Sequence, residues 1–383
     1  MYIARTFPLF YPIVTGPGKQ AYHISRGLGK LGHRCHLYTT TEAAATGDHA
    51  LDLRDIEVTR LPVSFRFMRF DVAPSFPRLL FREEFDILHS HGYRDYLSAV
   101  AFATAKAKRK PFVLQPHGAL YGYRYILTAD LWKPYRYYDI ATGKVIAKKA
   151  SGVVVSTTQE REEAVRFGVE PERISIIPPG IVPYEKARKP KSDQLAVLFV
   201  GRISPSRRVD DIIRAFSYVA RERPMRLTIV GEEGKLSSSE ETGYYQKLLT
   251  LTNELGISDR VTFAGPKFGD DLEREYETSD VFVYASAYES FGQPLFEAAI
   301  HGLAIVTTRV GVARDIVVHG TTGALFEIGD VTQLARHILA LASDSVKAKE
   351  MGDKVRAAVE SSYSWDRIVR TYLTLYEKLV DVQ

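Results

Sequence analysis

The chain has 383 residues, of which 45% are hydrophobic and 25% are charged. This length exceeds one ordinary hydrophobic core, so we expect two domains of about 150–200 residues each. The apolar runs, such as Leu195–Val200, are far shorter than the ~20 residues of a membrane span. The start lacks the apolar stretch of a signal peptide, and the single cysteine, Cys35, excludes an intramolecular disulfide and a cysteine-based zinc site. We therefore predict a cytoplasmic location.

The net charge of +5 is unevenly distributed. Residues 1–180 contain 25 Lys and Arg against 17 Asp and Glu, whereas residues 181–383 contain 26 against 29. A basic N-terminal half attracts anionic partners, although a solvated cationic surface explains the same count. The cations follow no recognisable nucleic-acid-binding motif, so we predict no nucleic-acid partner.

Short apolar or β-branched runs alternate with helical patterns along the chain. In the N-terminal half we expect strands at Arg34–Thr41, Ile56–Leu61, Ile87–His89, Phe112–Gln115, Gly152–Ser156 and Ile174–Ile177, and helices at Gln20–Leu31, Leu97–Lys106, Pro134–Lys149 and Thr158–Phe167. In the C-terminal half we expect strands at Ala196–Val200, Arg226–Val230, Val261–Ala264, Val281–Tyr284, Ala304–Thr307 and Gly323–Phe326, and helices at Val209–Arg223, Tyr244–Leu255, Asp271–Thr278, Pro294–His301, Thr332–Ala342 and Val346–Ser361. Such alternation predicts parallel sheets covered on both faces. The predicted fold class is α/β, with two Rossmann-like, doubly wound domains facing a cleft.

The two halves are separated by Pro178-Pro179-Gly180 and the polar segment Pro183–Gln194. Proline and glycine continue neither a helix nor a strand, and the polar segment has no apolar periodicity. We therefore predict a first domain over residues 1–182 and a second over residues 190–362.

Thr15-Gly16-Pro17-Gly18 precedes the first predicted helix. Glycine lets the backbone approach a ligand, and a helix N-terminus presents free N–H groups to an anion. Ala21 stands where the third glycine of a dinucleotide fingerprint would fall, which argues against a nicotinamide-dependent oxidoreductase. A plain tight turn is the alternative.

A loop rich in arginine, Val200–Arg208, directly follows a predicted strand. Parallel sheets place ligands at the C-terminal edge of their strands. Arg202, Arg207 and Arg208 put three cations there, enough to hold a diphosphate by charge-assisted hydrogen bonds. The alternative, most evenly balanced for Arg208, is pairing with surface carboxylates.

The segment from Glu289 to Glu297 has the most specific pattern. It follows a predicted strand, and Pro294 suits the first turn of the helix that it opens. The two carboxylates bracket this turn and can accept hydrogen bonds from sugar hydroxyls. An ordinary glutamate favoured by the helix dipole is the alternative for Glu297. The backbone N–H groups that would face a phosphate belong to Phe291, Gly292 and Gln293.

His117 lies just after the predicted strand Phe112–Gln115. A histidine at a strand end can donate to an oxyanion or a sugar oxygen, although a lone histidine is more often a packed or surface residue. His89 and His91 form a His-x-His pair, but no further ligand type clusters nearby, so we predict no metal site.

In chain order, these segments resemble the retaining glycosyltransferases of family 4 (glycosyltransferase group 1), whose two Rossmann-like domains form the GT-B fold. The resemblance covers nearly the whole chain, through Tyr2-Ile3-Ala4, Gly32–Leu37, Ala150–Ser156, Val169–Pro178, Val200–Val209, Ile229–Glu232, Val261–Gly265, Glu289–Glu297 and His319–Gly323. In that family the last helix crosses back onto the first domain. The resemblance therefore implies that residues 363–383 form a helix packing on the N-terminal domain.

The resemblance also implies residue roles. Glu289 would bind hydroxyls of the donor sugar, Glu297 the donor ribose, and His117 would lie near the transferred sugar. Arg202 falls on the family's diphosphate arginine, and Arg207 stands where lysine is usual, which keeps the charge but changes its geometry. The family's Asn-Gly-Val-Asp after the domain boundary is Pro179-Gly180-Ile181-Val182 here, so any role of that Asn or Asp is absent. The implied catalytic residues are Glu289, His117, Arg202 and Arg207, and the implied nucleotide-sugar-binding residues are Gly16, Gly18, Gly201, Arg202, Arg207, Gly231, Glu232, Phe291, Gly292, Gln293 and Glu297.

The implied function is retaining transfer of a sugar from a UDP-, GDP- or ADP-sugar to a hydroxyl of a glycan, a lipid-linked or a small-molecule acceptor. No Asp-x-Asp triplet occurs, which argues against a metal-dependent glycosyltransferase of the other common fold. We therefore predict no metal and no cofactor, since the nucleotide-sugar is a co-substrate. The alternatives are a retaining phosphorylase or nucleotide-sugar epimerase of the same fold, and a non-catalytic nucleotide-sugar-binding subunit.

The acceptor region is indicated less clearly. Leu61–Phe70, Tyr121–Tyr125 and Tyr135–Tyr138 alternate aromatic residues with arginine. Such a surface suits peripheral contact with lipid headgroups at the inner face of a membrane. An acceptor groove with stacking rings, or ordinary packing, explains the pattern equally well.

Overall fold

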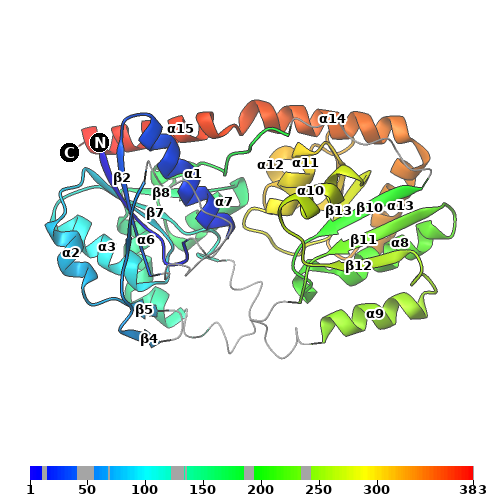
Figure 1. Ribbon diagram of the computed structural model, residues 1–383, viewed down its shortest axis with the longest axis horizontal. Helices are drawn as coiled ribbons and strands as arrows, with labels where there is room; N and C mark the ends of the chain where they lie inside the picture. The colour runs from blue at the N-terminus through cyan, green and yellow to red at the C-terminus, as the bar shows by residue number, and fades with distance from the viewer. Residues whose placement is uncertain are drawn as a thin grey trace. The chain divides into compact units, whose positions relative to one another are not determined.

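The computed structural model of the protein describes residues 1–10, 15–40, 56–67, 70–121, 133, 136–184, 194–233 and 243–382. The chain divides into two compact units. The first unit contains the described residues within 1–121, 133–181 and 363–382, and the second contains those within 182–362. Each is an α/β layer structure built on its own sheet (Figure 1).

The first unit is built on a seven-stranded parallel sheet. Across the sheet, the strands are β3 (Glu57–Arg60), β2 (Arg34–Thr39), β1 (Tyr2–Thr6), β6 (Ile87–His91), β7 (Phe112–Gln115), β8 (Gly152–Val155) and β9 (Ile174–Ile176). The helices of this unit are α1 (Gly16–Lys30), α2 (Phe76–Arg82), α3 (Tyr96–Ala107), α6 (Lys144–Lys149), α7 (Thr158–Phe167) and α15 (Trp365–Asp381). A short antiparallel hairpin joins β4 (Phe65–Phe67) to β5 (Phe70–Val72).

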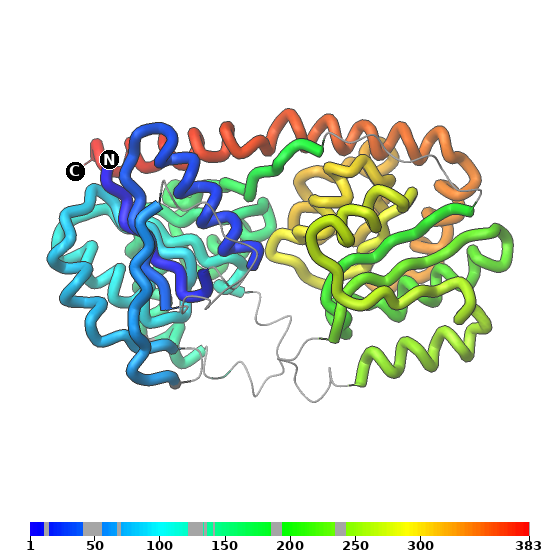
Figure 2. The backbone as a smooth tube through the Cα atoms, viewed as in Figure 1, coloured from blue at the N-terminus to red at the C-terminus, as the bar shows by residue number. Residues whose placement is uncertain are grey.

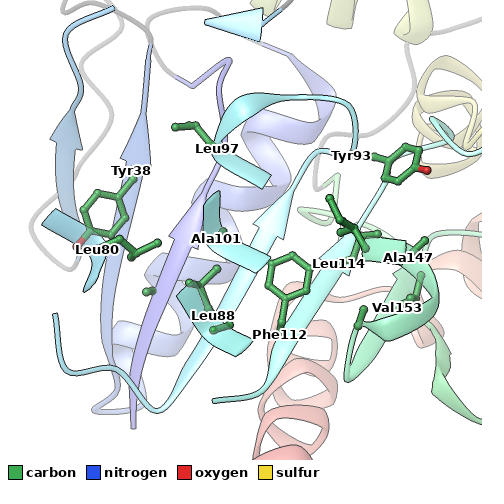
Figure 3. Close-up of a cluster of buried hydrophobic side chains, with 14 of the residues drawn as sticks. Tyr38, Leu80, Leu88, Tyr93, Leu97, Ala101, Phe112, Leu114, Ala147 and Val153 are labelled. Atoms are coloured by element: carbon green, nitrogen blue, oxygen red, sulfur yellow. The ribbon is translucent and has the colours of Figure 1, made fainter. Parts of the chain in front are cut away.

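Successive strand residues enter two different cores, because side chains alternate between the faces of a sheet. Leu88 and Phe112 belong to a large cluster with α2 and α3 (Figure 3). Their neighbours Ile87 and Val113 belong to a second cluster with α1 and α15. Burial on both faces explains why these strands are apolar on consecutive residues.

The last helix, α15, is part of the first unit and packs against α1 (Figure 2). Its buried side chains form a stripe at helical spacing, made of Ile368, Val369, Tyr372 and Tyr376. The approach to α1 is close, since a Cβ on Gly27 would lie 2.4 Å from Val369 Cγ2. The predicted return of the C-terminal helix to the first domain is therefore confirmed.

The second unit is built on a six-stranded parallel sheet. Across it, the strands are β12 (Val261–Gly265), β11 (Met225–Val230), β10 (Leu195–Val200), β13 (Val281–Tyr284), β14 (Ala304–Thr308) and β15 (Ala324–Phe326). Its helices are α8 (Val209–Ala220), α9 (Tyr244–Glu254), α10 (Gly269–Glu277), α11 (Gln293–Ile300), α12 (Ala313–Ile316), α13 (Val331–Ser343) and α14 (Ser345–Ser362). The predicted α/β class with two Rossmann-like parallel sheets is confirmed.

Several predicted boundaries differ from the structure. Helix α1 begins at Gly16 rather than Gln20, because Thr15 Oγ1 accepts a hydrogen bond from Gly18 N at 3.0 Å and Pro17 occupies the first turn. The hairpin β4–β5 and the short helices α2 and α12 were not predicted. The predicted helix Pro134–Lys149 includes a π-helix over Asp139–Gly143. Residues 185–193 of the predicted linker, and parts of the aromatic acceptor segments (68–69, 122–125 and 135), lie outside the described residues.

Candidate functional site

Two neighbouring strands of the second unit end in the loops that carry the predicted donor residues. Strand β10 leads into the arginine loop, and β13 leads into the segment that opens α11. These two strands pair in parallel, with Leu198 opposite Phe282. The C-terminal ends of paired parallel strands meet at one edge of the sheet, where ligands of such folds bind. The topology therefore brings together residues that lie about 80 positions apart in sequence.

Glu289 is buried at this edge and is held by several donors. Arg207 Nη1 and the Tyr284 hydroxyl both donate to Glu289 Oε1. Ser286 Oγ lies 3.5 Å from the same oxygen. Arg207 Nη1 also donates to Ser286 Oγ at 2.8 Å and to the Tyr288 carbonyl at 3.0 Å. The predicted sugar-binding carboxylate and the predicted phosphate-binding cation thus form an ion pair with each other.

The electrostatics of this pair are those of a desolvated site. Burial lowers the pKa of Arg207, but the neighbouring Tyr284 and Glu289 outweigh burial and raise it above its ordinary value. The pKa of Tyr284 is raised well above its ordinary value, first by burial. Arg207 Nε is buried and has no hydrogen-bond partner among the described residues. The guanidinium therefore keeps an unused N–H donor beside its carboxylate.

Arg202 and Arg208 occupy different surroundings, although both belong to the arginine loop. Arg202 is exposed, and its charge lies close enough to Tyr284 to oppose the rise in the pKa of that hydroxyl. Arg208 adopts a left-handed backbone conformation, with φ +50°, and its Nε donates to Asp211 Oδ2 at 2.5 Å. Arg208 therefore pairs with a carboxylate, as the alternative expected, but that carboxylate is buried and does not lie on the surface.

Helix α11 begins directly after Gly292, whose φ of +95° favours glycine. The first N–H groups of a helix have no acceptor within it, so they are available to an anion. The Phe291 carbonyl, by contrast, is engaged by Val312 N at 2.7 Å. On the helix, Glu297 accepts hydrogen bonds from the Tyr276 hydroxyl at 3.0 Å and from Gln293 Nε2 at 3.2 Å. This arrangement fixes the direction of the predicted ribose-binding carboxylate.

Gly201 and Gly231 hold two strand-end loops together. A Cβ on Gly231 would lie 1.9 Å from the Gly201 carbonyl oxygen, closer than any side-chain carbon tolerates. The next residue, Glu232, is exposed, and its carbonyl accepts a hydrogen bond from Ile203 N at 2.9 Å. Close packing of the two loops therefore explains these glycines without any ligand. Direct contact of Gly201, Gly231 and Glu232 with a nucleotide-sugar stays a prediction.

In the first unit, the predicted glycine turn forms the start of α1. No described atom lies within 4 Å of a Cβ built on Gly16. A Cβ on Gly18 would lie 3.0 Å from Thr15 Oγ1 and 3.4 Å from both the Leu9 carbonyl oxygen and Phe7. Among the described residues the space beside Gly16 is open, whereas Gly18 also serves the helix cap.

His117 follows β7 in a strained backbone conformation. Its φ is +50°, and Gly118 continues the turn with φ +77°. A positive φ is uncommon for residues other than glycine, and such strain clusters at functional sites. His117 Nε2 lies 3.2 Å from His91 Nδ1, and burial followed by the charge of Arg5 lowers the pKa of His117 to about 3. The histidine is therefore neutral at physiological pH.

Some residues around Glu289 and around His117 were not predicted from the sequence. Tyr284 and Ser286 stand at the end of β13, so their place in the strand-end loop was the available signal. Gly311 comes from a separate loop, and its missing Cβ leaves room for the Phe291 carbonyl, which would otherwise lie 2.4 Å away. Nothing in the local sequence connects Gly311 with that turn. Arg5 and His91 were likewise not assigned to the surroundings of His117.

Within the described part of the chain, no group of three or more His, Cys, Asp or Glu side chains is placed to share a metal ion. None of the helices in the same part of the chain is both long and apolar enough to cross a membrane.

The sequence model for glycosyl transferases group 1 matches residues 183–358, and the model for glycosyltransferase family 4 matches residues 14–184. The chain is 26% identical to N-acetyl-alpha-D-glucosaminyl L-malate synthase of Bacillus anthracis over 382 residues, which cover 96% of this chain and 94% of that protein. It is 30% identical to D-inositol 3-phosphate glycosyltransferase of Nocardia farcinica over 308 residues, which cover 76% of this chain and 66% of that protein.

The fold is also similar to that of HepE from Anabaena, solved in complex with UDP-glucose. The TM-score is 0.76 at 18% identity, with 99% of this chain and 100% of that chain covered. Together with the two parallel sheets and the returning C-terminal helix, these matches establish the family. The chain belongs to the retaining glycosyltransferases of family 4 (glycosyl transferases group 1), with a GT-B fold.

Proposed function

We propose that this enzyme transfers a sugar from a UDP-sugar to a hydroxyl of a small anionic acceptor, with retention of configuration and without a metal. The observation that carries the proposal is the meeting of Arg207 and Glu289 at the shared end of β10 and β13, beside the start of α11. This arrangement places a cation, a buried carboxylate and helix N–H groups at one sheet edge. A nucleotide-sugar needs these three groups for its diphosphate and its sugar.

In the proposed donor complex, the diphosphate is held by Arg202, Arg207 and the N-terminus of α11. The unused Nε–H of Arg207 supports this role, because a buried donor without a partner is costly unless a ligand completes it. Glu289 accepts hydrogen bonds from the sugar hydroxyls, and Glu297 accepts them from the ribose. Both carboxylates are already oriented by neighbouring hydroxyl or amide donors.

The proposed reaction breaks the bond between the anomeric carbon and the departing phosphate oxygen. The acceptor oxygen attacks on the same face of the sugar, and its proton passes to the departing phosphate. Charge that develops on this phosphate is stabilised by preorganised cations and helix N–H groups. Neutral His117 contributes a hydrogen bond and not a positive charge.

Two observations support an anionic acceptor. Residues 1–180 carry the excess of Lys and Arg, which attracts anions by long-range electrostatics. The acceptors in the names of the two relatives, L-malate and D-inositol 3-phosphate, are a carboxylate and a phosphate. Incubation of the enzyme with a UDP-sugar and a panel of hydroxy acids, sugar phosphates and neutral polyols tests this part. Transfer to neutral polyols alone would contradict it.

The donor is tested by a thermal-shift panel of UDP, GDP, ADP and their sugars, since ligands of the native state raise its melting temperature. We expect UDP and UDP-sugars to give the largest shifts. Stabilisation by GDP or ADP alone would contradict the choice of base. Proton NMR of the product reports the anomeric configuration, and UDP release that requires an acceptor separates transfer from epimerisation.

Peripheral membrane contact through the basic aromatic segments is a separate prediction. Phe65 and Tyr137 are exposed, as contact with an interface requires. Arg66, however, donates to Asp71 on the neighbouring strand at 2.5 Å, so its charge is partly balanced. Co-sedimentation with anionic vesicles at low and high salt tests the prediction. Absence of binding at low salt would reject it.

A further inference from the structure

A row of buried polar side chains crosses the first unit near the C-terminal ends of its central strands. Arg5 on β1 is fully buried, and its Nη2 is hydrogen-bonded to His91 Nε2 on β6. His91 Nδ1 in turn lies 3.2 Å from His117 Nε2, beyond the end of β7. The rings of His91 and His117 are nearly parallel, with 17° between their planes. The three residues form a continuous chain of hydrogen bonds.

The direction of this chain follows from the chemistry of its first member. A guanidinium has only N–H donors, so His91 Nε2 must accept and the proton of His91 must lie on Nδ1. That proton is then donated to His117 Nε2. The single proton of a neutral His117 is left on Nδ1, which makes no hydrogen bond within the described part of the chain.

The chain requires both histidines to be neutral. The pKa of His91 lies well below its ordinary value, first because of burial and then because of His89, Arg5 and His117. His89 stacks on His91, and Gln115 lies opposite His91 on the neighbouring strand. Tyr376 and Tyr372 lie one contact further away, against His89 and Gln115 respectively. Glu160 is a buried carboxyl near these groups. It interacts with the backbone of Gly118 and raises the pKa of Tyr372. A protonated His91 would place two cations in contact, because Arg5 Nη2 already occupies its Nε2.

A purely structural role explains this chain poorly. Arg5 Nε and Nη1 are buried without a hydrogen-bond partner among the described residues. Burying a cation in this way is costly compared with a packed apolar side chain of similar size. The strained φ of His117 adds to the cost. Such costs persist where they fix the geometry of a functional group.

We infer that Arg5 and His91 are positioning residues that lock His117 in its neutral Nδ1–H tautomer, so that it presents one fixed N–H donor to a substrate oxygen. The tautomer follows from the hydrogen-bond chain alone. Its use, donation to an oxygen of the transferred sugar or the acceptor, rests on the proposed function. Arg5 and His91 touch no substrate in this scheme.

Nitrogen-15 NMR of the histidine side chains at neutral pH tests the tautomer without any substrate. We expect His117 to show a protonated Nδ1 and an unprotonated Nε2, with the signals assigned through His117→Asn. Replacing Arg5 by Met removes the donor and should let the tautomers mix. A wild-type His117 that is protonated on Nε2, or on both nitrogens, would overturn the inference.

Two substitutions of His91 test the function of the chain. In His91→Asn the side-chain amide lies near the place of Nδ1 and can still donate to His117, whereas His91→Leu cannot. We expect His91→Leu to lower kcat by roughly tenfold to a hundredfold, less than outright removal of a preorganised donor usually costs. His91→Asn should recover most of this loss. UDP binding should be unchanged in both, because the proposed donor site lies in the second unit.

Tyr376→Phe is the matched control, since it removes the hydroxyl beside His89 and leaves the chain intact. Melting temperatures of all variants separate a folding defect from a catalytic one. Equal kcat in His91→Leu and His91→Asn, with both folded, would overturn the positioning role. The expected tautomer in a protein that transfers no sugar would overturn the proposed function and leave the hydrogen-bond chain standing.

Discussion

The two units both place an arginine at the centre of a polar site, but only one of the two arginines has a charged partner. In the second unit, Arg207 forms an ion pair with Glu289. In the first unit, Arg5 is surrounded by neutral rings and makes no ion pair among the described residues. Each member of this ion pair can exchange its protein partner for a ligand group: the arginine can bind a phosphate and the glutamate can bind a sugar hydroxyl. A neutral chain instead offers one hydrogen bond of fixed direction.

This difference matches the separate demands of sugar transfer. Negative charge develops on the departing diphosphate, where cations are most effective. The sugar and the acceptor present hydroxyl groups, which a neutral donor recognises without attracting other anions. The comparison predicts that substitutions at the site of the second unit weaken donor binding and turnover, and that the histidines and Glu160 near His117 in the first unit behave as uncharged groups.

The largest effect is expected for Glu289→Ala in the second unit. The substitution removes the acceptor for sugar hydroxyls and leaves Arg207 without its carboxylate. We expect kcat to fall by about 100- to 1,000-fold, the usual cost of losing a preorganised polar contact. UDP binding, measured by calorimetry, should survive. Glu289→Gln keeps an oxygen acceptor and serves as the control. Full turnover by Glu289→Ala would contradict the role of Glu289 in binding the hydroxyls of the donor sugar.

A large loss of stability is expected for Gly231→Ala. The new Cβ would meet the Gly201 carbonyl oxygen, and the φ of +145° disfavours any side chain. We expect a loss of about 2–4 kcal/mol in the free energy of unfolding, measured in urea, from overpacking and backbone strain together. Gly243→Ala is the control, because Gly243 also has a positive φ but no described atom lies within 4 Å of a Cβ built on it. Equal losses would show that the close approach of the loops contributes nothing.

A smaller effect on donor binding is expected for Arg207→Met. Loss of a charge-assisted hydrogen bond to phosphate should weaken UDP binding by about 10- to 100-fold. Arg207→Lys keeps the charge and should lose less affinity, although it cannot reproduce the fork geometry of the guanidinium. Calorimetry on both variants measures this. UDP affinity unchanged in Arg207→Met would remove this residue from the diphosphate site.

The smallest effect is a change in the pH dependence of stability for Glu160→Gln in the first unit. Burial raises the pKa of Glu160 to about 7, against 4.5 ordinarily. The folded protein therefore keeps a proton that the unfolded chain has released, and this group costs stability as the pH rises from 4.5 to 7. The variant has no such proton. The difference in unfolding free energy should move in favour of the variant by about 1.4 kcal/mol per pH unit at most.

Urea unfolding at several pH values measures this difference. The histidines contribute to the pH dependence of the unfolding free energy in both the wild type and the variant. Their contribution therefore cancels in the difference. A difference that does not vary between pH 4.5 and 7 would mean that Glu160 is ionised throughout. It would also contradict the view that the buried titratable groups around His117 stay uncharged.

The same contrast explains what could be predicted from the sequence. Glu289, Gly292 and Glu297 lie in one continuous segment, so their spacing was visible before the fold was known. Arg5 lies on β1, His91 lies on β6 and His117 follows β7, and only the pairing of β1 with β6 and of β6 with β7 brings them together. No local pattern carries such a contact. The ion pair of Arg207 with Glu289 was missed for the same reason, although both residues were predicted.

Helix boundaries show a similar limit. Glycine and proline before Gln20 predicted a turn, but the cap formed by Thr15 lets α1 begin within that turn. The short helix α12 is too brief for its periodicity to be recognised.

The most direct test compares the binding of UDP and of UDP-sugars to the wild-type enzyme and to Glu289→Ala by calorimetry. The account predicts that at least one UDP-sugar binds the wild type more tightly than UDP does. In Glu289→Ala this advantage of the sugar should disappear while UDP itself still binds. An unchanged advantage of the sugar in Glu289→Ala would contradict the placement of the donor sugar at Glu289.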